Sequence, residues 1–103
     1  MMTNTVLTIK EQIKKDFGVD LPILGGDGQS IDNPIIIDPK CKDWSSVEYS
    51  YVKLINQALG RSWKVVNTSL IEHNGHKIDQ LKLAIDGDDE NFYNYYFDVT
   101  DHV

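Results

Sequence analysis

Residues 61–86 read RSWKVVNTSLIEHNGHKIDQLKLAID, and this stretch decides the fold. Two runs rich in β-branched and aliphatic residues flank Asn74-Gly75, a dipeptide that strongly favours a two-residue hairpin turn because both positions tolerate positive φ. The stretch therefore predicts a β-hairpin with strands at residues 63–72 and 77–85. The remaining segments of the chain are interpreted around this hairpin.

The predicted register, in which Val66 pairs with Leu83, sorts the hairpin side chains into two faces. One face is mostly aliphatic and is expected to contribute to the core: Val66, Thr68, Leu70, Leu81, Leu83 and Ile85. The second face mixes apolar and polar groups: Trp63, Val65, Asn67, Ser69, Ile71, Ile78, Gln80, Lys82 and Ala84. Aromatic groups among small polar side chains are typical of an interaction surface. The competing interpretation is that residues 9–17 or the glycine-rich loop at 25–28 cover this face within the same chain.

A short amphipathic helix is predicted over residues 9–17. Thr8 and Glu11 have the spacing of a capping box, in which each side chain accepts a hydrogen bond from the other residue's backbone N–H. Apolar residues then recur at every fourth position, and Gly18 is a typical residue for the end of a helix. A helix of about two and a half turns is not stable alone, so it is expected to dock on another element.

The main helix is predicted over residues 46–59. Ser45 and Glu48 again have capping-box spacing, and Gly60 follows as a stop signal. An apolar stripe is expected to face the sheet: Tyr51, Val52, Ile55, Ala58 and Leu59. The opposite side is expected to face solvent: Lys53, Asn56 and Gln57. This helix is the natural cover for the aliphatic face of the hairpin.

The remaining segments complete an α+β fold, interpreted as a single domain over residues 1–103. Residues 34–37 predict a short strand at a sheet edge or in the loop region, and residues 92–99 predict a third antiparallel strand beside the second. Residues 18–33 are expected to form a loop, and residues 86–91 a turn. The expected architecture is a two-layer sandwich: a three- to four-stranded, mainly antiparallel sheet, one main helix packed on it and a short N-terminal helix. In outline this is similar to cystatin-like or NTF2-like domains, a similarity of architecture that implies no function.

Composition and charge limit the possible function classes. The 103 residues contain 10 Lys and Arg against 16 Asp and Glu, a formal net charge of −6. Residues 1–85 hold ten of each sign, so the whole net charge lies in residues 86–103. This acidity disfavours nucleic acid as a partner, because phosphate contacts need Lys and Arg, and it favours a basic protein partner.

Localisation is constrained by what the sequence lacks. It contains no stretch long and apolar enough to span a membrane and no signal-peptide pattern at its start. A single cysteine, Cys41, excludes a disulfide within the chain. We therefore expect a cytoplasmic protein that does not act at a membrane.

Four groups of residues could carry chemistry, and none has the spacing that a site requires. Residues 86–90 cluster oxygen ligands but lack the pattern of a calcium-binding loop. His73 and His76 face each other across the hairpin turn without a third ligand for zinc. Cys41 has no positioned base, and the glycine-rich loop at 25–28 lacks the Lys-Ser/Thr of a phosphate-binding loop. We therefore expect no metal, no cofactor and no enzymatic activity.

The function favoured by these patterns is that of a small, acidic, non-enzymatic protein-binding module. Its composition resembles that of immunity proteins against toxins and of phage-encoded inhibitors, which implies neutralisation of a basic partner. The residues expected to contact the partner are Trp63, Lys82, Asp88, Asp89, Glu90, Phe92, Tyr96 and Asp98. One alternative is a small-ligand pocket between helix 46–59 and the sheet, lined by Tyr49, Tyr51, Trp63, Tyr93 and Tyr95. The other is a homo-oligomeric structural module, including a homodimer formed through the mixed face or a strand edge.

Overall fold

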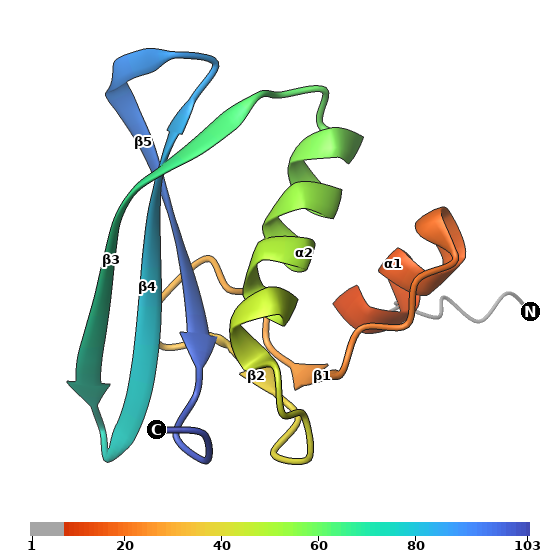
Figure 1. Ribbon diagram of the computed structural model, residues 1–103, viewed down its shortest axis with the longest axis vertical. Coiled ribbons are helices and arrows are strands. Elements are labelled where there is room, and N and C mark those ends of the chain that lie inside the picture. Colours follow the sequence, from red (N-terminus) through yellow and green to blue (C-terminus); the bar gives the residue numbers. More distant parts are fainter. Residues whose placement is uncertain (1–7) are drawn as a thin grey trace, which may run out of the picture.

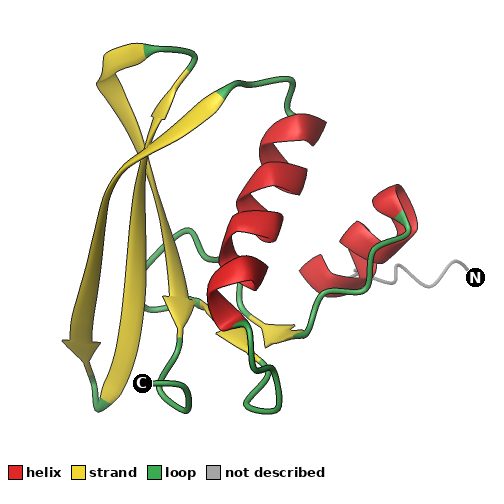
Figure 2. Cartoon of the chain, in the orientation of Figure 1, coloured by secondary structure: helices red, strands yellow, loops and turns green. Residues whose placement is uncertain are grey.

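A computed structural model describes the backbone of residues 8–103 and the side chains of residues 8–87 and 92–103. Its elements are α1 (Ile9–Phe17), β1 (Ile23–Gly25), β2 (Ile35–Ile37), α2 (Trp44–Ala58), β3 (Trp63–His73), β4 (His76–Ile85) and β5 (Asp88–Asp98). Within these residues the strands form one sheet in the order β1-β2-β5-β4-β3. Figures 1 and 2 show both helices on the same side of the long strands, so a helical layer packs on a sheet.

The predicted α+β class is confirmed, but the sheet has five strands where three to four were expected. β1 lies in a segment predicted as loop, and β2 is internal because it pairs with β1 on one side and β5 on the other. The β2–β5 pair is parallel, whereas the other pairs are antiparallel. β1 and β2 are three residues long each, which is too short to show a period in the sequence. Pairing with β5, more than sixty positions away along the chain, is decided by the tertiary fold.

A β-bulge changes the register within the first strand of the hairpin. From the tight turn outward, β3 and β4 first pair as predicted. Between Val65 and Asn67 the register shifts, so Leu83 pairs with Val65 instead of Val66. A shift of one residue places the side chains on the far side of the bulge from the turn, at residues 63–65, on the opposite face of the sheet from the predicted one. Trp63 and Val65 therefore pack against the core, contrary to the prediction, and Val66 is 45% exposed.

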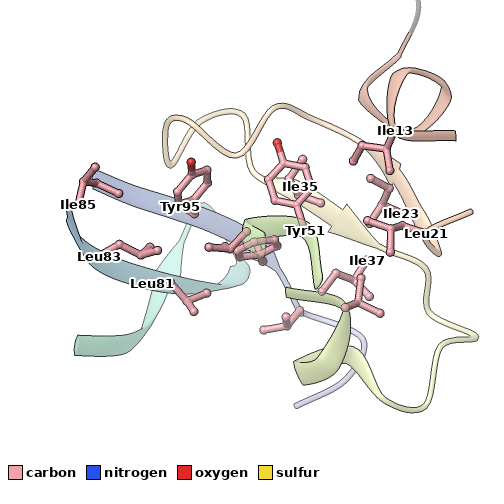
Figure 3. Packing of buried hydrophobic residues seen from close by; sticks show 14 residues of the cluster. Ile13, Leu21, Ile23, Ile35, Ile37, Tyr51, Leu81, Leu83, Ile85 and Tyr95 are labelled. Atoms are coloured by element: carbon pink, nitrogen blue, oxygen red, sulfur yellow. The ribbon is translucent and has the colours of Figure 1, made fainter. Parts of the chain in front are cut away.

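The core lies between the helices and the sheet (Figure 3). Its buried residues are Ile13, Leu21, Ile23, Ile35, Ile37, Val47, Tyr51, Val52, Leu81, Leu83, Ile85, Tyr95, Phe97 and Val99. The aliphatic face predicted for β4 is therefore confirmed. Leu70, also predicted as core, is 57% exposed because it lies on β3, the edge strand farthest from α2 in Figure 1.

Helix α1 has the bounds and the caps predicted for it. The Thr8 hydroxyl accepts a hydrogen bond from the Glu11 backbone N–H at 3.2 Å, and the Glu11 carboxylate accepts from the Thr8 N–H at 3.1 Å. The helix ends at Gly18, whose φ is 69°. Ile13 is buried and docks the helix on the core. These signals were readable because capping involves residues only three positions apart.

Helix α2 begins at Trp44, two residues earlier than predicted, with Asp43 at its N-cap. The capping box predicted between Ser45 and Glu48 is wrong. Glu48 instead faces the core and is only 2% exposed. A local sequence pattern cannot distinguish a glutamate that caps a helix from one that tertiary packing buries.

The buried side of α2 also differs from the predicted stripe near the end of the helix. Asn56, expected to face solvent, is fully buried, and its Nδ2 donates to the Val52 carbonyl oxygen at 2.8 Å. Ala58 and Leu59, expected to face the sheet, are exposed. Periodicity of apolar residues could not find this face because two of its members, Glu48 and Asn56, are polar.

The glycine-rich segment leads a loop, residues 26–33, around the edge of β5 to the sheet face opposite the helices, which we call the outer face. Gly28 is buried and its carbonyl oxygen accepts from the Tyr96 N–H at 2.9 Å. Gly26 has a φ of 82°, and a Cβ atom there would lie 1.7 Å from the Pro34 carbonyl oxygen. The glycine is therefore required by a close approach of two backbone segments.

Candidate functional site

The outer face is covered by the chain itself at one end only. It carries Asn67, Ser69, Ile71, Ile78, Gln80, Lys82, Ala84, Phe92, Asn94, Tyr96 and Asp98. Loop 26–33 covers the end near the β3–β4 turn, where Ile78 is 1% exposed. At the other end Phe92 is 39% exposed, and no described segment lies over it. Helix α1 is not the cover, because it lies on the same side of the sheet as α2 (Figure 1).

The uncovered end holds a set of side chains that we call the Phe92 patch: Gln80, Lys82, Phe92, Asn94 and Tyr96. The Lys82 ammonium lies 4.3 Å from the centroid of the Phe92 ring, within the range of a cation–π contact. Gln80 Nε2 donates to Asn94 Oδ1 at 3.0 Å across the β4–β5 pair. These contacts hold an aromatic ring and two amides in place on a sheet surface, which is a preorganised arrangement for binding.

The covered end contains two histidine–aspartate pairs. His73 Nε2 lies 2.8 Å from Asp32 Oδ1, and His76 Nδ1 lies 2.9 Å from Asp98 Oδ2. A cavity of about 320 Å³ lies beside them under the loop. Asp98 also accepts from the Thr100 N–H at 3.0 Å. Its carboxylate is therefore occupied within the chain, a pairing that sequence spacing alone could not indicate.

The structure brings together three of the residues predicted to contact a partner. Lys82, Phe92 and Tyr96 belong to the Phe92 patch. Asp98 lies at the covered end of the same face, and Trp63 is on the helix side because of the bulge.

The acidic residues predicted as a turn lie instead at the beginning of β5. The turn consists of Asp86 and Gly87, with φ of 52° and 74°, and β5 begins at Asp88. Asp-Gly is a hairpin signal of the same kind as Asn-Gly, so the sequence did contain the information for this turn. The side chains of the predicted contacts Asp88, Asp89 and Glu90 lie outside the described residues.

A second concave region lies between α2 and the side of β5 that faces away from β4. A pocket between helix 46–59 and the sheet was expected, and three of its five expected residues, Tyr51, Tyr93 and Tyr95, line this region. It is a cleft of about 590 Å³ lined by Ile9, Gln29, Tyr51, Ile55, Leu59, Arg61, Phe92, Tyr93, Asn94, Tyr95 and Tyr96. Among the described residues that line it, Arg61 is the only charged one. No motif marks this cleft, because its walls come from four separate segments of the chain.

Arg61 is held in the cleft by three contacts. Its Nε donates to Asn56 Oδ1 at 3.0 Å, and Nη2 lies 3.4 Å from the Tyr95 hydroxyl. Its Cζ lies 4.5 Å from the centroid of the Tyr93 ring. It forms no ion pair with any carboxylate whose side chain is described. Among the described side chains, no carboxylate neutralises the positioned guanidinium, and its remaining N–H groups are suited to an anion.

Tyr51 and Tyr95 belong to the core cluster, where Figure 3 labels them, and both also line the cleft. Tyr51 donates to the Asp27 carbonyl oxygen at 3.2 Å, and its ring meets Tyr95 edge-on at 6.1 Å between centroids. Burial raises the pKa of Tyr51 well above its ordinary value, with smaller contributions from Tyr95 and Asp27. Tyr51 is therefore a neutral hydrogen-bond donor rather than an acid or base in this cleft.

The remaining unusual group is the buried carboxyl of Glu48. Burial, followed by a hydrogen bond to Asp79 and its charge, raises the pKa of Glu48 to about 10. The Glu48 carboxyl is therefore protonated at neutral pH. Glu48 lines neither the cleft nor the cavity described above. It affects stability, and we do not assign it to a site.

Comparisons with known proteins add no candidate role: no family model, curated protein or solved structure matches the chain. Among the described side chains, no three His, Cys, Asp or Glu residues converge as metal ligands. Across residues 8–103 no helix is long and apolar enough to cross a membrane.

Proposed function

We propose that this protein is a non-enzymatic binding module of the inhibitor or immunity type, which recognises a basic protein partner. The observation that supports this proposal is the Phe92 patch. The chain uses its own loop to cover one end of the outer face and leaves the other end, with an aromatic ring and an ordered set of polar groups, open to solvent.

The shape and chemistry of the patch favour a protein over other partners. It is a sheet surface rather than a deep pocket, and an aromatic anchor surrounded by amides is typical of the centre of a protein interface. Residues 86–103 hold six acids and no Lys or Arg, and four of these acids lie in residues 86–90, in the β4–β5 turn and at the beginning of β5, just before Phe92. A basic partner would be attracted to these four acids, and its association rate would depend on salt.

The proposal is tested by capturing partners from the native host on tagged protein, with two matched variants. Phe92→Ser alters the patch, whereas Tyr49→Ser alters an exposed aromatic residue, 40% accessible, on the opposite layer. A stoichiometric partner is expected to be retained by the wild type and by Tyr49→Ser and lost with Phe92→Ser. Its association rate is expected to fall several-fold between about 50 mM and about 300 mM salt. Equal retention by both variants, or no partner at the lower salt concentration, would count against the proposal.

A second candidate function, small-ligand binding, is favoured by the Arg61 cleft. The space between the middle of α2 and the sheet is filled by Tyr51, Val52 and their core neighbours, so a ligand would bind at the cleft. Tyr51, Tyr93 and Tyr95 line the cleft, as the small-ligand alternative expects, whereas Tyr49 and Trp63 do not. Thermal-shift screening of small carboxylates and phosphates tests this function.

The third alternative, a homo-oligomeric module, is tested by the solution mass from light scattering.

A further inference from the structure

The edge of β5 that faces away from β4 is paired only over its last residues. β2 pairs with β5 at Phe97 and Asp98, and the Tyr96 N–H donates to the Gly28 carbonyl oxygen on the same side. Hydrogen-bonding direction alternates along a strand, so Asn94 and Phe92 direct their N–H and C=O groups to this side as Tyr96 does. No described strand pairs with them there. Four backbone groups are therefore available to an added strand.

The Arg61 cleft runs along this same edge. Phe92, Tyr93, Asn94, Tyr95 and Tyr96 all line it, although their side chains alternate between the two faces of the sheet. A cavity on one face would contact every second residue, so contact with five consecutive residues places the cleft at the strand's edge. The opposite wall is α2, and the cleft continues the line of β2 along β5. At about 3.3 Å per residue, the open edge from residue 92 to 95 accommodates roughly four residues of extended chain.

Arg61 supplies charge complementarity for a specific group on that chain. Asn56 and Tyr95 occupy only part of its donor set, and Tyr93 supports the guanidinium plane. A carboxylate is the usual two-point partner of a guanidinium. Arg61 is the one cation among the described residues of the cleft, in a protein of net charge −6, so it can select for an anionic group.

We propose that the open edge of β5 takes an extended segment of a partner protein as an added β-strand, and that an aspartate or glutamate of that segment binds Arg61. This inference rests on the proposed protein-binding function and names the form of the bound segment. Main-chain hydrogen bonds to Asn94 and Phe92 supply affinity, and the carboxylate sets the position of the segment. A partner that is basic overall can carry one acidic residue in the docked strand.

The test uses synthetic peptides of about six residues, blocked at both ends, as probes. Their central residue is glutamate, glutamine or lysine, and the neighbouring positions are varied among valine, threonine, isoleucine and tyrosine. Glutamate peptides are expected to bind about tenfold more tightly than the matched glutamine peptides, as for a charge-assisted hydrogen bond. Arg61→Gln should remove this preference, Arg61→Lys should retain part of it, and the control Lys64→Gln should leave it unchanged.

Amide hydrogen exchange provides a readout of strand addition that is independent of affinity. Bound peptide is expected to slow exchange at the Asn94 and Phe92 amides. Peptides N-methylated at alternate residues are expected to lose binding when the methyl groups lie on the pairing edge and to retain it when they lie on the other edge. Thermal unfolding of the Arg61 variants checks that they remain folded.

Several results would overturn the inference. Glutarate binding as tightly as the best glutamate peptide would identify a small-ligand site, and protection of the same amides by concentration-dependent dimerisation would identify a second copy as occupant. Absence of peptide binding across the whole set would also reject edge pairing. In that case the capture experiment still decides the proposed function, since a partner lost with Phe92→Ser but retained by Arg61→Gln would bind through the outer face alone.

Discussion

Replacing Glu48 with glutamine is expected to stabilise the protein near neutral pH and to flatten its dependence on pH. Glu48 is 2% exposed on the buried side of α2, beside Asp79 of β4. Burial first, and Asp79 second, raise its pKa from 4.5 to about 10. The carboxyl is therefore protonated in the folded protein at neutral pH and ionised in the unfolded chain, so folding must take up a proton.

The magnitude follows from this difference in pKa. A group whose pKa is raised on folding contributes its full stability below the unfolded pKa of 4.5 and loses it as pH rises towards about 10. Between 4.5 and about pH 7 the loss extends over roughly 2.5 units at about 1.4 kcal/mol each, or about 3.5 kcal/mol. Glutamine has nearly the same shape, can donate a hydrogen bond to Asp79 and does not titrate. Glu48→Gln is therefore expected to raise the free energy of unfolding by up to about 3.5 kcal/mol near pH 7 and by little near pH 4.

The assay is urea unfolding of the wild type, Glu48→Gln and a control, Glu72→Gln, between about pH 5 and about pH 8.5. Glu72 is an exposed acid on β3, so its variant should keep the wild-type slope. The difference between wild type and Glu48→Gln should widen by about 1.4 kcal/mol for each unit of pH. If Glu48→Gln is less stable than the wild type near pH 7, or keeps the wild-type slope, then Glu48 is ionised in the folded protein and the reasoning is refuted.

Two further predictions concern the backbone. Gly26→Ala is expected to lower the free energy of unfolding by more than about 2 kcal/mol, because its Cβ would clash with Pro34. Gly25→Ala places nothing within 4 Å of the added atom and should change the free energy of unfolding by less than about 1 kcal/mol. Thermal unfolding measures both variants, and equal effects would contradict the close approach of Gly26 and Pro34. Val65→Ala should lower the free energy of unfolding by about 1–3 kcal/mol and Val66→Ala by less than about 0.5 kcal/mol, as measured by chemical denaturation. The reason is that the bulge places only Val65 against the core. A larger effect of Val66→Ala would indicate a hairpin without the bulge.

Much of the candidate surface could be predicted from the sequence, and the reason is local periodicity. The alternation in residues 92–99 and the Asn-Gly turn correctly assigned Phe92, Tyr96 and Lys82 to one face. Trp63 was assigned to the wrong face because a bulge inserts one residue without leaving a composition signal. Three tyrosines of the cleft, Tyr51, Tyr93 and Tyr95, were expected in a pocket between the helix and the sheet. The place of Arg61 among them could not be predicted, since it follows from tertiary packing.

The sequence by itself determined the features that depend on near neighbours. These are the capping box and end of α1, the tight turn between β3 and β4, and the two faces of β4 and β5. Each rests on residues within a few positions of one another, where backbone preference and periodicity are sufficient.

Tertiary structure alone decided the contacts between segments that are distant in sequence. It paired β2 with β5 in parallel, buried Glu48 against Asp79, and folded loop 26–33 over one end of the outer face. The described residues leave the Phe92 patch and the open edge of β5 uncovered as a result. Burial and hydrogen bonding between short segments that are distant in sequence decide these contacts, because the local preferences of such short segments are too weak to do so.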